Sequence, residues 1–266
     1  MAIPDIVREQ VAAYDRAYEQ GSMGTLIDEG YSHQTKDLMI RAALSALENV
    51  KQHDHELQPK ENLTVCDFGA GTGLMGKELA QLPGAESLEV FPVEISSAAC
   101  RAIVRSAKYG DFDNLRCYPP IRYHGTEIPF QNECFNIVLA ADVMEHVHDL
   151  PHTLNEIWRI MDRSGVFVMN IPLPNFEVNY ASNKVKTRDL RTLIEMMKLA
   201  AKRTIRMGRA DFQANFGETR LSIEQWEQLL QEHHFAIVGS AFWPQEPGLS
   251  PLSGVIIARK GFHYSK

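Results

Sequence analysis

The spacing of hydrophobic and polar residues changes near residue 60 of this chain. In residues 4–19 and 35–51, apolar side chains recur at near-helical intervals, which predicts two helices joined by a connection containing Gly21, Gly24 and Gly30. From residue 63 onward, short apolar runs alternate with amphipathic segments. This alternation of strands and helices predicts a parallel sheet that is covered by helices on both faces.

The predicted strands of this region are residues 63–68, 88–95, 137–140 with their flanks, and 166–171, and the predicted helices are residues 75–82, 98–108 and 150–161. Residues 173–220 interrupt the alternation. After them, Ser222 and Gln225 form the S-x-x-Q pattern of a capping box, which predicts that a helix begins there. Two final strands are predicted near residues 235–241 and 254–259.

Composition narrows the range of functions. The chain has 266 residues, 44% of them hydrophobic, with 27 basic and 34 acidic side chains and a net charge of -7. These values exclude a disordered chain and disfavour nucleic-acid binding. The four cysteines form no CxxC pair, and neither a signal peptide nor a membrane-spanning run is found. We therefore expect a cytoplasmic protein without an integral membrane segment, either a monomer or a homodimer.

The charge is distributed unevenly along the chain. Residues 184–209 hold nine basic and two acidic side chains, which leaves a net charge of -14 on the rest. Apolar residues recur at helical spacing in the same segment, so it is predicted to form a basic amphipathic helix. Its basic face is interpreted as solvated surface, as a clamp for an anionic substrate or as a contact for an acidic partner.

A glycine-rich turn follows the first predicted strand in residues 65–73 (VCDFGAGTG). Glycine at such a turn lets the backbone approach a ligand closely. The spacing matches neither a phosphate-binding P-loop nor the G-x-G-x-x-G dinucleotide fingerprint. Asp67 beside the turn favours a cationic ligand, and Glu94 at the end of the next strand can accept both hydroxyls of a ribose.

Five segments in order resemble the successive motifs of class I S-adenosylmethionine-dependent methyltransferases, in particular of the type 11/25-like proteins with small-molecule acceptors. They are residues 65–73 (VCDFGAGTG), 93–96 (VEIS), 128–138 (IPFQNECFNIV), 142–147 (DVMEHV) and 156–165 (EIWRIMDRSG). The resemblance implies a Rossmann-like α/β fold, with a seven-stranded, mostly parallel sheet and helices on both faces. It also implies an N-terminal helical lid (residues 1–58) and a methyltransferase domain (59–266) with a helical cap inserted at 173–220.

The same resemblance implies S-adenosylmethionine as the cofactor. Asp67 would lie near its methionine amino group, Glu94 would bind the ribose and Ile95 would pack on the adenine. The sequence departs from the family at His124, where an aspartate usually reads the adenine, so either His124 or the backbone of the next two residues takes that role. The full set of expected cofactor-binding residues is Asp67, Gly69, Ala70, Gly71, Gly73, Glu94, Ile95, His124, Gly125, Thr126 and Ala141.

The catalytic candidates, Asp142 and His146, follow the strand at 137–140. A general base is needed only where the acceptor must lose a proton. In the family that the chain resembles, the pair Glu145-His146 often orients its loop whatever the substrate, and this interpretation is favoured over a catalytic role. The pattern Asp142-x-x-Glu145-His146 resembles that of magnesium-dependent quinone-biosynthesis O-methyltransferases. A zinc site at His146, His148 and His152 is disfavoured because Pro151 interrupts a shared helical face. No metal is assigned.

Tyr14, Tyr18, His33 and Tyr180 are the substrate-binding candidates, although ordinary packing explains the first three equally well. We expect a methyltransferase that acts on oxygen or nitrogen of a small, in one interpretation anionic, molecule by in-line displacement. The alternatives are a carbon methyltransferase of the quinone or lipid type at a membrane surface and a non-catalytic cofactor-binding module.

Overall fold

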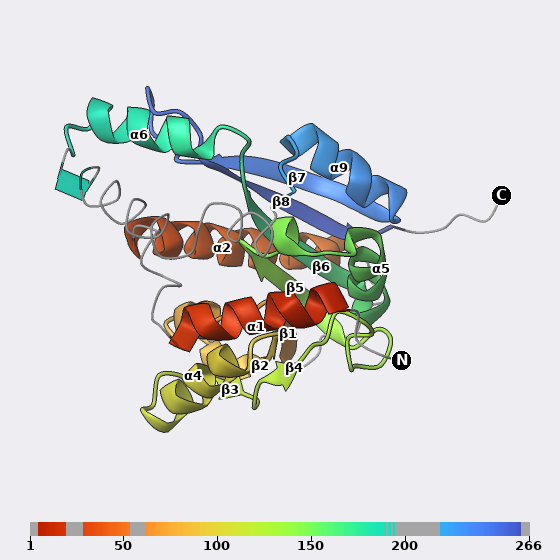
Figure 1. The fold of residues 1–266 in the computed structure, drawn as a ribbon. Coiled ribbons are helices and arrows are strands. Elements are labelled where there is room, and N and C mark those ends of the chain that lie inside the picture. Colours follow the sequence, from red (N-terminus) through yellow and green to blue (C-terminus); the bar gives the residue numbers. More distant parts are fainter. Residues whose placement is uncertain are drawn as a thin grey trace.

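The computed structural model describes residues 5–19, 29–53, 62–189, 191–192, 194 and 219–261. Its strands build one sheet in the order β3-β2-β1-β5-β6-β8-β7, with β4 paired to β2 (Figure 1). The strands are β1 (Leu63–Phe68), β2 (Leu88–Glu94), β3 (Arg116–Cys117), β4 (Ile121–Arg122), β5 (Phe135–Ala141), β6 (Met161–Pro172), β7 (Phe235–Trp243) and β8 (Ser253–Lys260).

The pairing is parallel except that β8 runs antiparallel to both β6 and β7. Both β3 and β4 pair with β2, at successive positions along it. Pro119 and Pro120 lie between them, and because proline has no backbone N–H to donate, they divide one edge strand into two short pieces. The mostly parallel, Rossmann-like sheet expected from the sequence is thereby confirmed.

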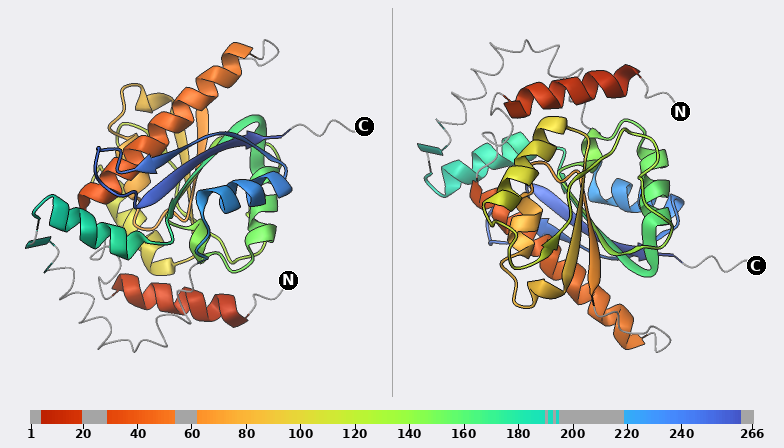
Figure 2. Two further views of the ribbon diagram at one scale, coloured as in Figure 1. Left: turned by 90° about the horizontal axis from the view of Figure 1, so that it is seen from above. Right: turned by 90° about the horizontal axis from the view of Figure 1, so that it is seen from below.

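Helices cover the sheet on both faces (Figure 2). Residues of α2 pack on one face, and residues of α5 and α9 pack on the other. The helices are α1 (Asp5–Glu19), α2 (Glu29–His53), α3 (Leu74–Leu79), α4 (Ser97–Lys108), α5 (Leu150–Ile160), α6 (Phe176–Lys186) and α9 (Ile223–Glu232), with two short 3-10 turns, η1 (Ala85–Ser87) and η2 (Met144–His146). The capping box at Ser222 and Gln225 is confirmed as the start of α9.

Strand β5 explains how one short segment serves two cores. Ile137 and Leu139 belong to the cluster on the α2 side, whereas Val138 and Ala140 belong to the cluster on the α5 side. Successive side chains of a strand point to opposite faces, so a continuous apolar run is what a strand buried on both faces requires.

Helix α2 is part of this layered core. Met39, Ile40 and Leu47 are buried in the same cluster as Val65 and Val166 of the sheet. Its place in the core differs from the expectation that both N-terminal helices form a lid. The helix also begins earlier than expected, at Glu29, so that Gly30 lies in its first turn rather than in the connection.

The segment after β6 also differs from the expectation of one basic helix from residue 184. Helix α6 ends at Lys186, and Arg188 has a left-handed backbone with φ of 59°. Asp189 donates its backbone N–H to Lys184 O at 2.9 Å and accepts a hydrogen bond from Thr192 N at 3.3 Å, which stabilises the break. Residues 195–209 of the predicted helix lie outside the described residues. Among the helices that the structure describes, none is long and apolar enough to cross a bilayer.

Candidate active site

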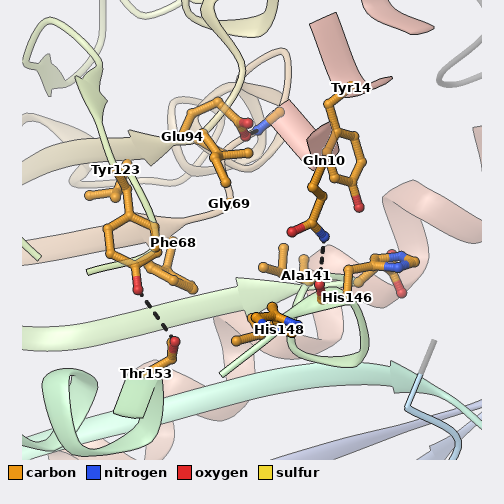
Figure 3. Close-up of a pocket in the computed structure, with 18 of the residues that line it drawn as sticks. Gln10, Tyr14, Phe68, Gly69, Glu94, Tyr123, Ala141, His146, His148 and Thr153 are labelled. Atoms are coloured by element: carbon orange, nitrogen blue, oxygen red, sulfur yellow. Dashed lines mark hydrogen bonds between the residues drawn. The ribbon is translucent and has the colours of Figure 1, made fainter. Parts of the chain in front are cut away.

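A cavity of about 490 Å³ opens at the carboxyl ends of β1, β2 and β5 and lies under α1 (Figure 3). This is the edge of an open α/β sheet where ligands are generally bound. Most of the residues that the sequence singled out line it: Tyr14, Tyr18, Gly69, Ala70, Gly71, Glu94, Ile95, Gly125, Thr126, Ala141, Asp142 and His146.

The glycine turn between β1 and α3 forms one wall of the cavity. The N–H groups of Gly69 and Ala70 both donate to Val93 O, at 2.8 and 3.0 Å, so β2 fixes the turn. Gly69 has φ of 73°, and a Cβ placed on it would overlap Cγ2 of Val143 and lie 2.7 Å from Cγ1. Only glycine therefore fits this position.

Glu94 ends β2 and turns its carboxylate toward the glycine turn. Oε2 accepts a hydrogen bond from Gly71 N at 2.7 Å, and Oε1 accepts one from Ser96 N at 2.8 Å. Burial raises the pKa of Glu94, and these backbone hydrogen bonds oppose that shift. A carboxylate has about four acceptor positions, so two bonds leave acceptor capacity for the hydroxyls of a ligand.

Asp67 and Lys36 are two buried titratable side chains near the turn. Lys36 comes from α2 and lines the cavity, whereas Asp67 is buried in β1 behind the turn and does not line it. Burial raises the pKa of Asp67 to about 7, with Lys36 opposing and Glu94 reinforcing the shift. Oδ2 of Asp67 is buried and has no hydrogen-bond partner among the described residues. The site therefore favours a ligand with a cationic group.

The opposite side of the cavity is formed by the loop after β4 and by the start of α5. Tyr123, Gly125, Thr126 and Thr153 line it. The hydroxyl groups of Tyr123 and Thr153 lie 3.3 Å apart (Figure 3). His124, the expected replacement for the family aspartate, does not line the cavity.

The loop after β5 brings Asp142 and His146 to the cavity. Asp142 has φ of 55°, a conformation that aspartate tolerates better than most residues. Buried Asn170 of β6 holds it twice, since Nδ2 donates to Asp142 Oδ1 at 2.5 Å and the Asn170 carbonyl accepts from Asp142 N at 3.1 Å. The ring of His146 meets that of Tyr14 edge-on at 6.4 Å, and Gln10 Nε2 donates to His146 O at 2.7 Å.

Besides Asp67 and His124, three further candidates do not line the cavity. His33 is half exposed and pairs with Glu78. Tyr180 is buried on α6 in a cluster with Leu252, so it does not reach the cavity. Gly73 precedes α3 with φ of 87°, and a Cβ added to it would lie 3.1 Å from the ring of Phe112, which gives this glycine a packing role instead.

Sequence reasoning missed Lys36 and Gln10 as residues of the cavity. A signal existed for Lys36, because positions 36, 40, 43 and 47 share one face of a helix and the last three are apolar and buried. A lysine on such a stripe is rarely buried without a role. Nothing in the local pattern marks Gln10, whose contact with His146 spans 136 positions of the chain.

No group of three or more His, Cys, Asp or Glu side chains that could hold a metal ion occurs within the described part of the chain. Glu145, the middle member of the magnesium-like pattern, is buried, and its carbonyl accepts a hydrogen bond from Thr219 N at 2.7 Å.

Comparison with known proteins identifies similar sequences and folds. A family model described as a methyltransferase domain matches residues 31–240. Sterol methyltransferase-like 3 of Botryococcus braunii is 28% identical over 126 residues, which make up 46% of this chain and 30% of that protein. Ubiquinone biosynthesis O-methyltransferase of Azorhizobium caulinodans is 30% identical over 122 residues, 44% of each chain. The alignments therefore cover less than half the length of these relatives.

A solved structure matches almost the whole chain. It is the 1,6-didemethyltoxoflavin-N1-methyltransferase of Burkholderia thailandensis, which contains 1,6-didemethyltoxoflavin and S-adenosylhomocysteine. The TM-score is 0.56 at 15% identity, and the alignment covers 98% of this chain and 92% of the other. At that identity the likeness concerns the fold.

Proposed function

Because this chain belongs to the methyltransferase-domain family, with S-adenosylmethionine as cofactor, we propose that it transfers a methyl group to an oxygen or nitrogen atom of a small molecule. One observation carries the proposal. The glycine turn, Glu94 and the Asp142–His146 loop, from three separate strands, line a single cavity of about 490 Å³. The volume is within the range of small-molecule sites, roughly 300–1,000 Å³.

The residues of the cavity fit this cofactor. Glu94 would take the ribose hydroxyls, and the turn at Gly69 would allow close approach of the backbone. Asp67 lies behind the turn and does not line the cavity, but its buried oxygen lacks a hydrogen-bond partner among the described residues, so its negative charge would favour the ammonium group of the methionine part on the other side of the turn. Lys36 would hold the carboxylate of that part.

The adenine would lie on the opposite side of the cavity. Because His124 does not line it, we assign adenine recognition to the backbone at Gly125 and Thr126. Ile95 and Tyr123 offer apolar surface for the ring.

The cofactor, when bound, supplies an electrophilic methyl group on a sulfonium. The chain must then align an acceptor atom, and orientation of this kind accounts for much of the acceleration in such displacements. We assign His146 the role of accepting the proton when the methyl acceptor is an O–H or N–H group. Asp142, which Asn170 fixes, is assigned to orient that methyl acceptor. Gln10 holds the backbone of His146, and the ring of Tyr14 lies edge-on to the imidazole.

A second candidate function is methylation of a ring carbon in a sterol-like or quinone-like acceptor, the acceptor classes that the names of two relatives suggest. Val143, Val147 and Leu74 give the cavity apolar walls that suit such a ring. A cytoplasmic location and a monomeric or homodimeric state belong to the proposal as well.

Cofactor binding is tested by calorimetry with S-adenosylhomocysteine. Glu94→Ala is expected to weaken binding about tenfold or more, since it removes the charged acceptor of two hydroxyls. Glu246→Ala, on an exposed loop, is the matched control and should bind as the wild type does. Equal affinity in both variants would refute the site assignment.

The acceptor is tested with methyl-labelled cofactor and a panel of phenols, aromatic amines, quinols and sterols. His146→Ala should lower kcat by about 10²–10⁴-fold for an O–H or N–H acceptor without changing affinity for S-adenosylhomocysteine. Transfer to a ring carbon alone would contradict the leading proposal and favour the second candidate.

A further inference from the structure

Helix α1 lies over the cavity and precedes the segment that matches the family model, which begins at residue 31. It presents Val7, Gln10, Tyr14 and Tyr18 to the cavity. These positions are spaced by three or four residues, so they share one face of the helix. Both ends of this face abut the ligand-binding loops. A Cβ on Gly125 would lie 3.1 Å from Val7, and one on Gly71 would lie 3.0 Å from the Tyr18 hydroxyl.

Asp15 fixes α1 to the start of α4. Its Oδ1 accepts hydrogen bonds from Ser96 Oγ at 2.6 Å and Ala98 N at 3.0 Å, and its Oδ2 accepts one from Ser97 Oγ at 2.8 Å. Burial alone would raise the pKa of Asp15, but these three hydrogen bonds outweigh it and lower the pKa. The carboxylate also lies at a helix N-terminus, where negative charge is stabilising.

The anchor of α1 is connected to the ribose-binding carboxylate. Ser96, whose side chain donates to Asp15, gives its backbone N–H to Glu94 at 2.8 Å. Glu94 in turn accepts from Gly71. A continuous path of hydrogen bonds therefore runs from α1 to the glycine turn, and it ends beside the Tyr18 hydroxyl.

Tyr18 keeps its proton in this position. Burial, and then the negative charge of Glu94, raise the pKa of Tyr18 above its usual value. Its hydroxyl can therefore donate a hydrogen bond to an oxygen between Gly71 and Glu94. A ribose bound by Glu94 would bring its oxygens to this place.

We propose that α1 completes the cofactor site, with Tyr18 as a cofactor-binding residue at the ribose and Asp15 as the residue that positions it. This inference rests on the proposed cofactor site and reassigns Tyr18, which the sequence placed at the methyl acceptor. The chemical group recognised is the ribose part of a nucleoside, on the side facing α1.

The test is calorimetry of S-adenosylhomocysteine with Tyr18→Phe, Asp15→Ala and the double variant. Removal of one hydrogen bond at Tyr18 should weaken binding about three- to tenfold. Asp15→Ala should weaken it comparably, whereas the double variant should be little weaker than either single variant, because both remove the same contact. Asp15→Asn keeps an acceptor oxygen for Ser96 and Ala98 and should restore most of the affinity.

Matched controls separate this inference from the cofactor assignment. Tyr109→Phe alters a tyrosine that is 84% exposed and should leave the affinity unchanged. Limited trypsinolysis reports on α1 directly, since Arg8 and Arg16 are exposed there. S-adenosylhomocysteine should slow cleavage at these sites in the wild type and much less in Asp15→Ala.

If Tyr18→Phe binds as tightly as Tyr109→Phe while Glu94→Ala binds weakly, the role of α1 is wrong and the cofactor site stands. If the effects of Asp15→Ala and Tyr18→Phe multiply in the double variant, Asp15 does not act through Tyr18. If the wild type does not bind the ligand at all, both proposals fail.

Discussion

Alanine at position 69 is expected to damage the cofactor site through two separate physical effects. The first is backbone strain, because Gly69 has φ of 73° and a left-handed conformation costs a residue with a Cβ about 1–2 kcal/mol. The second is overlap with Val143, whose Cγ1 would lie 2.7 Å from the new Cβ. Overpacking of this kind costs about 1–3 kcal/mol. Together they predict a loss of about 2–5 kcal/mol in the free energy of unfolding.

The structure provides variants that separate the two effects. Gly84 has φ of 81° but no atom within 4 Å of a Cβ, so Gly84→Ala should lose only the strain energy, about 1–2 kcal/mol. Val143→Ala removes both methyl groups that the new Cβ would meet. In the Val143→Ala background, Gly69→Ala should therefore lower the free energy of unfolding by at least about 1 kcal/mol less than in the wild type, because the overlap with the valine methyl groups is absent.

Urea unfolding gives the free energies of unfolding of the wild type and of the four variants, and calorimetry with S-adenosylhomocysteine shows whether the turn still binds the ligand. Gly69→Ala should lower the affinity for S-adenosylhomocysteine as well as the stability of the fold, because the turn must shift away from Val143. Gly84→Ala should leave the affinity unchanged. The reasoning is refuted if Gly69→Ala is no more destabilising than Gly84→Ala, or if the loss is independent of the residue at position 143.

Two further variants probe the charged part of the site. Burial, opposed by Lys36 and reinforced by Glu94, raises the pKa of Asp67 to about 7 from an ordinary value of 3.8. Between about pH 4 and 7, the native state without ligand therefore holds a proton that the unfolded chain has lost. The free energy of unfolding should fall as the pH rises through this range, and urea unfolding at several pH values should show a shallower dependence on pH in Asp67→Asn. Lys36→Met should weaken the binding of S-adenosylhomocysteine but not that of adenosine, which lacks the carboxylate. Equal losses of affinity for both ligands in calorimetry would contradict the assignment of Lys36 to the carboxylate.

Much of the fold could be predicted because its signals are local. The buried run of β5 and the stripe of α5 follow from spacings of two and of three to four residues, and the capping box at Ser222 is a three-residue pattern. The break at Arg188 was missed because it depends on hydrogen bonds of Asp189, in a segment whose composition reads as continuous helix.

The candidate site was predictable where strands end, but only in part where helices approach from outside, since Tyr14 and Tyr18 of α1 were expected and Lys36 and Gln10 were not. Gly69 and Gly71 come just after β1 and Glu94 is the last residue of β2, and parallel strands bring their carboxyl ends to one edge of the sheet. Lys36 and Gln10 enter the cavity from helices, so their roles depend on how each helix is rotated and placed. Tyr180 failed as a candidate for the same reason, since its side of α6 packs on Leu252.

The sequence by itself determined the layered α/β sheet, the location of the cavity, and the glycine turn and Glu94 that line it. Each of these depends on short-range periodicity or on the few backbone conformations that a tight turn after a strand allows. Only the tertiary structure decided which side of α1 faces the cavity, that Tyr18 lies at Gly71 while His33 pairs with Glu78, and that α2 belongs to the core. These outcomes depend on contacts between residues far apart in the chain, such as the hydrogen bond between Asp15 and Ser96. Local sequence patterns do not predict such contacts.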